Sequence, residues 1–412
     1  MAVDTPATIA IVGAGPIGIE AALYARYLGY DVVVFDQGEV GHHLRQWGDV
    51  RLFTPFEMNS TPLGLAALRA QSPELQRPEP EAILTGQQWL DGYLLPLAES
   101  DLLAGSIRCN TQVLSLGRSH LHKSDAIGDP DLRGDGDFRL LLCDEHGESS
   151  FDADIVIDAS GSYSQARWLG AGGMPAVGER QLRANGQIQT NIPAADKCSQ
   201  YVGKHTAVIG SGYSAATTMC RIMAMIAENP GTHISWIVRQ EIDQPIQTIK
   251  NDRLIERAQL AESANQAAMS AHVDFMPGVS VSQIETTDGQ FTLQLHGKED
   301  SAITVDHIIA NVGYRPDTTL FEELQVHLCY ATSGPMKLAA SLLKTQSEDC
   351  LDQSSAGSVT LLNPEPDFYI LGAKSYGRNS SFLLSVGHQQ IRELFSVIGD
   401  RADLDLYANA RI

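Results

Sequence analysis

The chain has 412 residues, a formal net charge of −21 and six cysteines. This length predicts about two to three domains, and the acidic balance argues against nucleic acid, whose phosphates need a basic surface. No apolar run is long enough to span a bilayer and no basic segment precedes an apolar one at the N-terminus, so we expect no membrane association and a cytoplasmic location.

The first predicted elements are a buried strand, a glycine-rich turn and a helix, which end at residues 12, 18 and 28. A second buried strand then runs from residue 31 to Asp36. This order of strand, glycine turn, helix, strand and acid is the dinucleotide-binding fingerprint.

Each feature of that fingerprint has a separate physical task. Gly13 permits the tight turn, Gly15 lets the backbone approach a pyrophosphate, and Gly18 lets the helix pack closely on the strand. The helix N-terminus offers free N–H groups and a positive dipole end to the phosphates. Asp36 is placed to accept hydrogen bonds from a ribose diol.

The next stretch, residues 41–56, mixes aromatic and polar residues without a clear period and predicts a covering loop. Helical spacing follows over residues 89–103, and strand patterns cover residues 107–116 and 138–143. Between these strands, residues 118–136 are rich in Asp, Gly and His and predict an exposed hairpin loop. The sequence predicts no metal site there or elsewhere.

A second fingerprint begins with a strand at residues 206–209 and continues into a glycine turn and an apolar helix that ends near residue 226. The third glycine position holds alanine, which the fingerprint tolerates. The residues expected to bind this second dinucleotide are Gly210, Gly212, Ser214 and Ala215.

The two fingerprints differ at the end of their second strands. The first strand pair ends in Asp36, whereas the second ends in Arg239. A guanidinium binds the 2′-phosphate that a carboxylate would repel, so we expect FAD at the first site and NADPH at the second. The alternative is that Arg239 is an ordinary surface arginine. The nearby Glu241 supports this alternative, because its charge would repel a phosphate.

The order of motifs predicts an α/β protein with two Rossmann-like dinucleotide-binding domains. The FAD domain is expected to comprise residues 1–169 and 301–412, with an NADPH domain, residues 170–300, inserted between them. A C-terminal helix over residues 382–397 is expected to point its N-terminal end at the flavin ring.

Two small-residue turns complete the pattern. A buried strand ends in residues 158–161 (Asp-Ala-Ser-Gly), and another leads into residues 311–317 (Asn-Val-Gly-Tyr-Arg-Pro-Asp). With the two fingerprints, these turns resemble the two-dinucleotide-domain flavoproteins, which include the thioredoxin-reductase-like enzymes and the class B flavin monooxygenases. The resemblance implies that Gly161 and Gly313 lie in cofactor-binding turns that join the FAD and NADPH domains.

The branch within this group is indicated by the cysteines and the C-terminal segment. CxxC is absent, and Gly372 is followed by Ala373-Lys374 where many disulfide reductases have Gly-Asp. Residues 375–390 are similar to the ends of the N-hydroxylating and flavin-containing monooxygenases. The FxGxxxHxxx(W/Y) signature is absent ahead of Gly210, so the chain resembles a divergent member.

The resemblance implies an NADPH-dependent FAD monooxygenase that oxygenates a small amine or sulfur nucleophile through a flavin C4a-(hydro)peroxide. The candidate catalytic hydrogen-bond donors are Arg45, Asn59 and His388. The resemblance also places further residues near the flavin: Trp47, Gly372, Asn379 and Ser380. His388 could equally be a surface or core histidine, and Trp47 a packing residue.

Two other functions remain open from the sequence. One is an NADPH-dependent flavoprotein reductase without a redox dithiol, and the other is a non-catalytic, redox-responsive flavoprotein that binds a partner. For the favoured function the partners are a small-molecule substrate and oxygen, and the sequence leaves a homodimer open.

Overall fold

The computed structural model describes residues 5–74, 76–226, 229, 231–344 and 349–410. The chain divides into two compact units. The first unit consists of Met1–Gln46, Thr54–Gln165 and Arg315–Ile412, and the second of Trp47–Phe53 and Ala166–Tyr314. Within the described ranges, no helix combines the length and apolar composition needed to cross a bilayer.

The first unit is built on a five-stranded parallel sheet. Its strand order is β15 (Phe368–Ile370), β7 (Ile155–Asp158), β1 (Thr8–Val12), β2 (Asp31–Phe35) and β3 (Ile107–Arg108). In the register of the sheet, Ile11 of β1 lies opposite Val34 on one side and Ile157 on the other. The central strands are mostly apolar on both faces, as parallel sheets require when both faces are covered, and Asp158 at the end of β7 is a buried exception.

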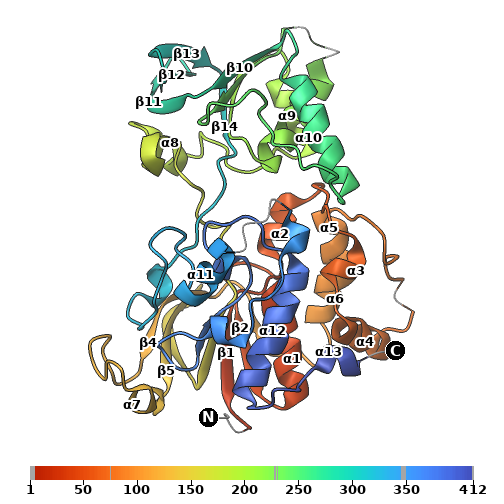
Figure 1. Cartoon of the computed structure of the whole chain (residues 1–412), viewed down its shortest axis with the longest axis vertical. Coiled ribbons are helices and arrows are strands. Elements are labelled where there is room, and N and C mark those ends of the chain that lie inside the picture. Colours follow the sequence, from red (N-terminus) through yellow and green to blue (C-terminus); the bar gives the residue numbers. More distant parts are fainter. Residues whose placement is uncertain (1–4, 75, 227–228, 230, 345–348, 411–412) are drawn as a thin grey trace. The chain divides into compact units, whose positions relative to one another are not determined.

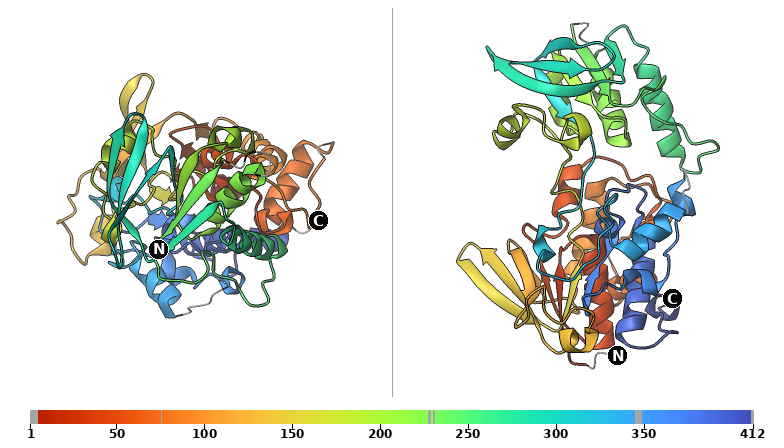
Figure 2. Two further views of the ribbon diagram at one scale, coloured as in Figure 1. Left: turned by 90° about the horizontal axis from the view of Figure 1, so that it is seen from above. Right: turned by 60° about the vertical axis from the view of Figure 1, so that its left-hand side comes forward.

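Two different layers cover this sheet (Figure 1). Helix α1 (Pro16–Leu28) lies beside α12 (Leu384–Ile398) on one side. On the other, Ala10 and Val12 pack into a core with Phe138 and Leu140 of an antiparallel sheet. That sheet consists of β4 (Gln112–Arg118), β5 (Phe138–Asp144) and β6 (Gly147–Ala153), and forms a layer of its own in Figure 2.

Shorter helices complete the first unit. They are α2 (His42–Trp47), α3 (Phe56–Asn59), α4 (Pro62–Gln71), α5 (Gly86–Trp89), a π-helical turn (Leu90–Leu94), α6 (Leu95–Ala98), α7 (Pro130–Gly134), α11 (Met336–Lys344), α13 (Leu406–Asn409) and 3₁₀ turns at Thr319–Phe321, Cys350–Asp352, Ser358–Leu361 and Gly372–Tyr376. The loop predicted over residues 41–56 is therefore wrong at α2, where Leu44 is buried and anchors a helical turn. The strand predicted over residues 107–116 is interrupted between β3 and β4.

The segment between β4 and β5 is not wholly exposed, which corrects the sequence prediction. Arg118 and Arg133 at its two ends are buried and share the carboxylate of Glu365. Arg118 Nε donates to Glu365 Oε1 at 2.8 Å, and Arg133 Nη2 donates to Oε2 at 2.7 Å. The backbone N–H of Gln325 donates to the same Oε2 at 2.8 Å. These buried charges therefore connect the segment between β4 and β5 to the rest of the first unit.

The second unit repeats the same layered plan. Its parallel sheet has the order β10 (Val273–Pro277), β9 (His233–Val238), β8 (His205–Ile209) and β14 (His307–Ala310). Helices α9 (Tyr213–Ile226) and α10 (Ile255–Ala267) pack on one face. The antiparallel strands β11 (Ser280–Thr287), β12 (Gln290–His296) and β13 (Ser301–Val305) pack on the other. The smaller elements are α8 (Glu179–Ala184) and 3₁₀ turns at Ala171–Gly173 and Ala195–Tyr201.

The boundaries of the second unit differ from the predicted residues 170–300. Residues 301–314 belong to this unit, because β14 pairs in parallel with β8 and places Ile309 opposite Val208. Residues 47–53 also belong to it. There Asp49 forms an ion pair of 3.1 Å with Arg221. Strand pairing and this ion pair, rather than local composition, set the boundaries.

Candidate functional site

The first glycine turn is packed directly on the turn that follows β7. Gly13 has φ +105°, and a Cβ at this position would lie 2.8 Å from the Ala159 carbonyl oxygen and from Ser160 Cα. A Cβ at Gly18 would lie 1.8 Å from the Gly13 carbonyl oxygen. Only glycine therefore allows the strand, the turn and α1 to approach this closely.

Gly15 differs from its neighbours because the space above it is open. A Cβ there would meet no heavy atom of the described chain within 4 Å. Gly15 is the N-cap of α1, where no side chain caps the helix and no acidic residue lies in the first turn. The helix N-terminus is therefore free to receive an anion, and the space fits the pyrophosphate of a dinucleotide.

Asp36 is held at the end of β2 by the turn itself. Its Oδ2 accepts the Ala14 backbone N–H at 2.7 Å, and its Oδ1 accepts the Gly38 N–H at 2.9 Å. A carboxylate has about four acceptor positions, so both oxygens can still accept from a ligand. The arrangement fits the ribose diol for which the sequence predicted this residue.

The C-terminal segment reaches the same end of α1. Gly372 has φ +71°, and a Cβ there would lie 3.2 Å from the Ile17 side chain. The buried Gln390 of α12 holds this segment, because its Oε1 accepts the Gly372 N–H and its Nε2 donates to Ser375 Oγ, both at 3.0 Å. Sequence reasoning missed Gln390, whose only signal is a polar residue on the buried face of an amphipathic helix.

Other predicted flavin-site residues lie in turns of the first unit. Gly161 has φ +72° and follows the turn that packs on Gly13. Asn379 is half-buried and its Oδ1 accepts the Ser381 N–H at 2.9 Å, whereas Ser380 is exposed. Trp47, by contrast, is the last residue of α2 and is the one residue of that helix assigned to the second unit.

The three predicted catalytic donors have separate surroundings. Arg45 faces Glu39 at 3.3 Å. Asn59 is buried and donates through Nδ2 to the carbonyl oxygens of Thr54 and Pro55, both at 3.0 Å, so its donors already hold a turn. His388 is buried beside Tyr407, with no described partner for Nε2, and burial lowers its pKa to about 3. No described contact joins any two of the three.

The second glycine turn has the same construction as the first. Gly210 has φ +134°, and a Cβ there would lie 2.2 Å from the Asn311 carbonyl oxygen. At Gly212 a Cβ would meet no described heavy atom within 4 Å. In the first turn of α9, Ala215 is fully buried and Ser214 is exposed, and Gly313 has φ +81°. The turns 158–161 and 311–313 thus support equivalent glycine turns, each within its own unit.

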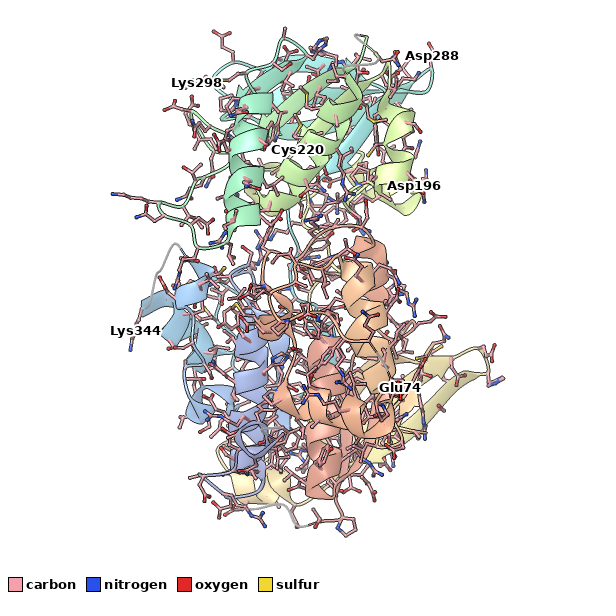
Figure 3. All side chains as sticks on the ribbon, turned by 90° about the vertical axis from the view of Figure 1, so that its right-hand side faces the viewer. Glu74, Asp196, Cys220, Asp288, Lys298 and Lys344 are labelled. Atoms are coloured by element: carbon pink, nitrogen blue, oxygen red, sulfur yellow. The ribbon has the colours of Figure 1, made fainter. Side chains whose placement is uncertain are left out.

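Arg239 is exposed directly after β9, and the residue that follows it, Gln240, lines a cavity of about 340 Å³. Ser211 of the glycine turn lines this cavity. The other lining residues belong to the loop after β9 and include Gln240 and Ile242. Glu241 lies 2.9 Å from Lys298, which extends from the turn after β12 (Figure 3). Because Lys298 offsets the charge of Glu241, the acid beside Arg239 is a weaker obstacle to a phosphate than the sequence indicates.

All six cysteines lie within the described ranges and carry free thiols. Cys220 projects from α9 (Figure 3) and packs against the core of the second unit. Cys329 has a lowered pKa, because the Thr332 hydroxyl and backbone N–H both hydrogen-bond to its sulfur. No disulfide joins any of these six cysteines, and no two of them have CxxC spacing in the sequence.

Comparison with known proteins gives one family description. Two models described as pyridine nucleotide-disulphide oxidoreductase match residues 10–120 and 131–331. A search of curated proteins finds no match.

Among solved structures, the bacillithiol disulfide reductase of Bacillus cereus has a TM-score of 0.66 at 14% identity, over 96% of this chain and 100% of that one. The ornithine N-hydroxylase of Kutzneria sp. 744 has a TM-score of 0.63 at 13% identity, over 96% and 98%. Thioredoxin reductase of T. acidophilum has a TM-score of 0.55 at 16% identity, over 99% of both chains. At such identities these structures share the fold with this chain.

Proposed function

Because this chain belongs to the two-dinucleotide-domain flavoproteins of the pyridine nucleotide-disulphide oxidoreductase type, we propose that it is an NADPH-dependent FAD monooxygenase acting on a small amine or sulfur nucleophile. Its family makes it an FAD- and NAD(P)-dependent oxidoreductase. The observation that carries the finer proposal is that two glycine turns have open space at a helix end, while the sequence has no cysteine pair at CxxC spacing.

The residues of the first unit fit FAD. The glycine turn and the N-terminus of α1 would bind its pyrophosphate, and Asp36 would accept the hydroxyls of its adenosine ribose. Gln390 holds the Gly372–Ser375 segment against the same helix end. When bound, the flavin supplies the capacity to accept a hydride and then to activate oxygen.

The residues of the second unit fit NADPH. Gly212 leaves open space at the helix end for the pyrophosphate, and Arg239 follows the strand where a 2′-phosphate would lie. Among the described residues, no ion pair occupies the Arg239 guanidinium. It is therefore available for bidentate binding of a phosphate.

Arg239→Ala is expected to raise the KM for NADPH about tenfold or more and to leave the KM for NADH nearly unchanged. The loss of hydrogen bonds to a charged group costs about 1.5–3 kcal/mol, and each 1.4 kcal/mol is about tenfold. Steady-state kinetics with both cofactors test this. Arg180→Ala removes the same charge from an exposed position on α8 and is the control. Equal effects of Arg239→Ala on the two cofactors would exclude the phosphate role.

Oxygen stoichiometry tests the monooxygenase itself. With a panel of primary amines and thioethers as probes, we expect at least one to give equal amounts of NADPH oxidised, oxygen consumed and oxygenated product, with little hydrogen peroxide. Stopped-flow oxidation of the reduced protein with NADP⁺ bound should then show an absorbance transient that belongs to neither reduced nor oxidised flavin. Oxygen-independent NADPH oxidation with a quinone, and no oxygenated product from any probe, would contradict the proposal.

A second candidate, a reductase that uses a single thiol, is favoured by the position of Cys329. Its loop packs on the C-terminal segment, since a Cβ at Gly377 would lie 2.2 Å from the Thr332 carbonyl oxygen. The Arg378 N–H also donates to that oxygen at 2.8 Å. A lowered thiol pKa increases the thiolate fraction, and the Cys329 side chain is buried at 4% exposure. If this candidate holds, Cys329→Ser abolishes disulfide-dependent NADPH oxidation; a monooxygenase keeps its oxygen-dependent turnover in that variant.

A further inference from the structure

The first unit contains a buried lysine whose charge lies beside the glycine turn. The side chain of Lys374 is only 2% exposed, and its Nζ lies 2.6 Å from Oδ2 of Asp158, which is fully buried. Removing such charges from water is costly, so a pair of this kind persists only where its geometry compensates for the lost hydration. This pair lies outside the residues to which the proposed reaction gives a role.

Ser160 joins the lysine and the acid into one cluster. Lys374 Nζ donates to Ser160 Oγ at 3.0 Å. The Ser160 hydroxyl in turn donates to Asp158 Oδ1 at 2.6 Å, and the Ser160 backbone N–H donates to the same oxygen at 3.1 Å. The cluster therefore ties the turn after β7 to the 3₁₀ turn Gly372–Tyr376.

Both tied segments touch the end of α1 where a pyrophosphate would bind. Ser160 Cα lies 2.8 Å from the position of a Cβ on Gly13. The backbone of Gly372 lies against Ile17, in the first turn of α1. Asp158 directly precedes Ala159 and Ser160, which contact the glycine turn, and its charge would repel the two negative charges of a dinucleotide's phosphates if it were left alone.

We propose that Lys374 is a positioning residue for FAD, which permits the cofactor's phosphates to bind by cancelling the charge of Asp158 beside the glycine turn. The inference rests on FAD binding in the first unit and is independent of whether the reaction is an oxygenation. It predicts that the two halves of one ion pair affect FAD binding in opposite directions. A purely structural pair predicts that loss of either half weakens binding alike.

The test measures the FAD dissociation constant of the deflavinated full chain by quenching of flavin fluorescence, without NADPH. Lys374→Met is expected to weaken FAD binding about tenfold or more, because it leaves the buried carboxylate uncompensated. Asp158→Asn should bind FAD at least as tightly as the unmodified chain. The double variant Lys374→Met/Asp158→Asn, which carries neither charge, should bind FAD within about threefold of the unmodified chain.

Lys337→Met is the matched control, because it removes an exposed lysine from α11 of the same unit. Its FAD affinity should not change. If Lys374→Met fails to fold, the FAD dissociation constants of Asp158→Asn and of the double variant still test the proposal. Weakened binding in Asp158→Asn, or a double variant as weak as Lys374→Met, would overturn the proposal. Oxygenase activity enters none of these measurements, so failure of the proposed function leaves this test intact.

Discussion

Gly15→Val is expected to yield a folded chain that contains no FAD. In the structure a Cβ at Gly15 meets no described atom within 4 Å, and the backbone φ of −83° suits any residue. The valine would therefore not disturb the protein, but it would fill the space through which a pyrophosphate approaches the helix end. The ratio of FAD to protein is measured from the flavin absorbance and the protein concentration of the purified sample. This ratio should fall from about one FAD per chain to less than about one tenth of that value.

Two further glycine variants make this result specific. Gly212→Val occupies the equivalent open position in the second unit, so it should keep FAD and lose NADPH binding. Gly18→Val should instead prevent correct folding, because its Cβ would lie 1.8 Å from the Gly13 carbonyl oxygen. Full FAD content in Gly15→Val would show that FAD does not bind at the first glycine turn.

Glu365→Gln should lower the free energy of unfolding by about 3–5 kcal/mol, because it leaves two buried arginines without their anion. The side chains of Arg118 and Glu365 are fully buried, and that of Arg133 is 1% exposed, so water cannot replace the lost charge. Urea unfolding at pH 7 measures the effect. The control is Asp152→Asn, which breaks the exposed pair with Arg139 and should leave the unfolding midpoint almost unchanged because solvent screens it.

The effect of Glu365→Gln should depend on pH. Burial alone would raise the pKa of Glu365, but hydrogen bonds from Arg133 and Arg118 outweigh it and hold the pKa below the ordinary value of 4.5. Because the folded-state pKa is depressed, the carboxylate stabilises the protein fully above pH 4.5, and this contribution is lost as the pH falls below that value. The difference in unfolding midpoint between the two proteins should therefore shrink in acid. A difference that is constant from pH 7 to pH 3 would exclude an ionic role for Glu365.

Local sequence predicted the glycine turns because their chemistry is local. The positive φ of Gly13 and the close approach at Gly18 depend on residues within one strand, turn and helix. The same holds for the hairpin of β12 and β13, whose antiparallel pairing joins residues that are close together in the chain. In such segments the period of apolar residues and the position of glycine together leave few alternatives.

The boundary of the inserted unit was decided by tertiary structure. Residues 301–314 have the pattern of a strand and a turn, but their sequence does not say which sheet the strand joins. Pairing of β14 with β8 assigns it to the second unit. Residues 47–53 are likewise assigned to the second unit by tertiary structure. There the ion pair between Asp49 and Arg221 joins positions that are far apart in the chain.

By itself, the sequence determined the two dinucleotide folds, their order along the chain and the difference between Asp36 and Arg239. Only the tertiary structure determined the charge clusters. Arg118 and Glu365 are 247 residues apart, and Lys374 and Ser160 are 214 apart. A buried charge has no period and its partner has no fixed spacing, because the pair forms wherever folding excludes water from both groups. The sequence therefore predicted an exposed loop over residues 118–136, and it singled out Lys374 only as part of the Ala373-Lys374 pair that follows Gly372 in place of an aspartate.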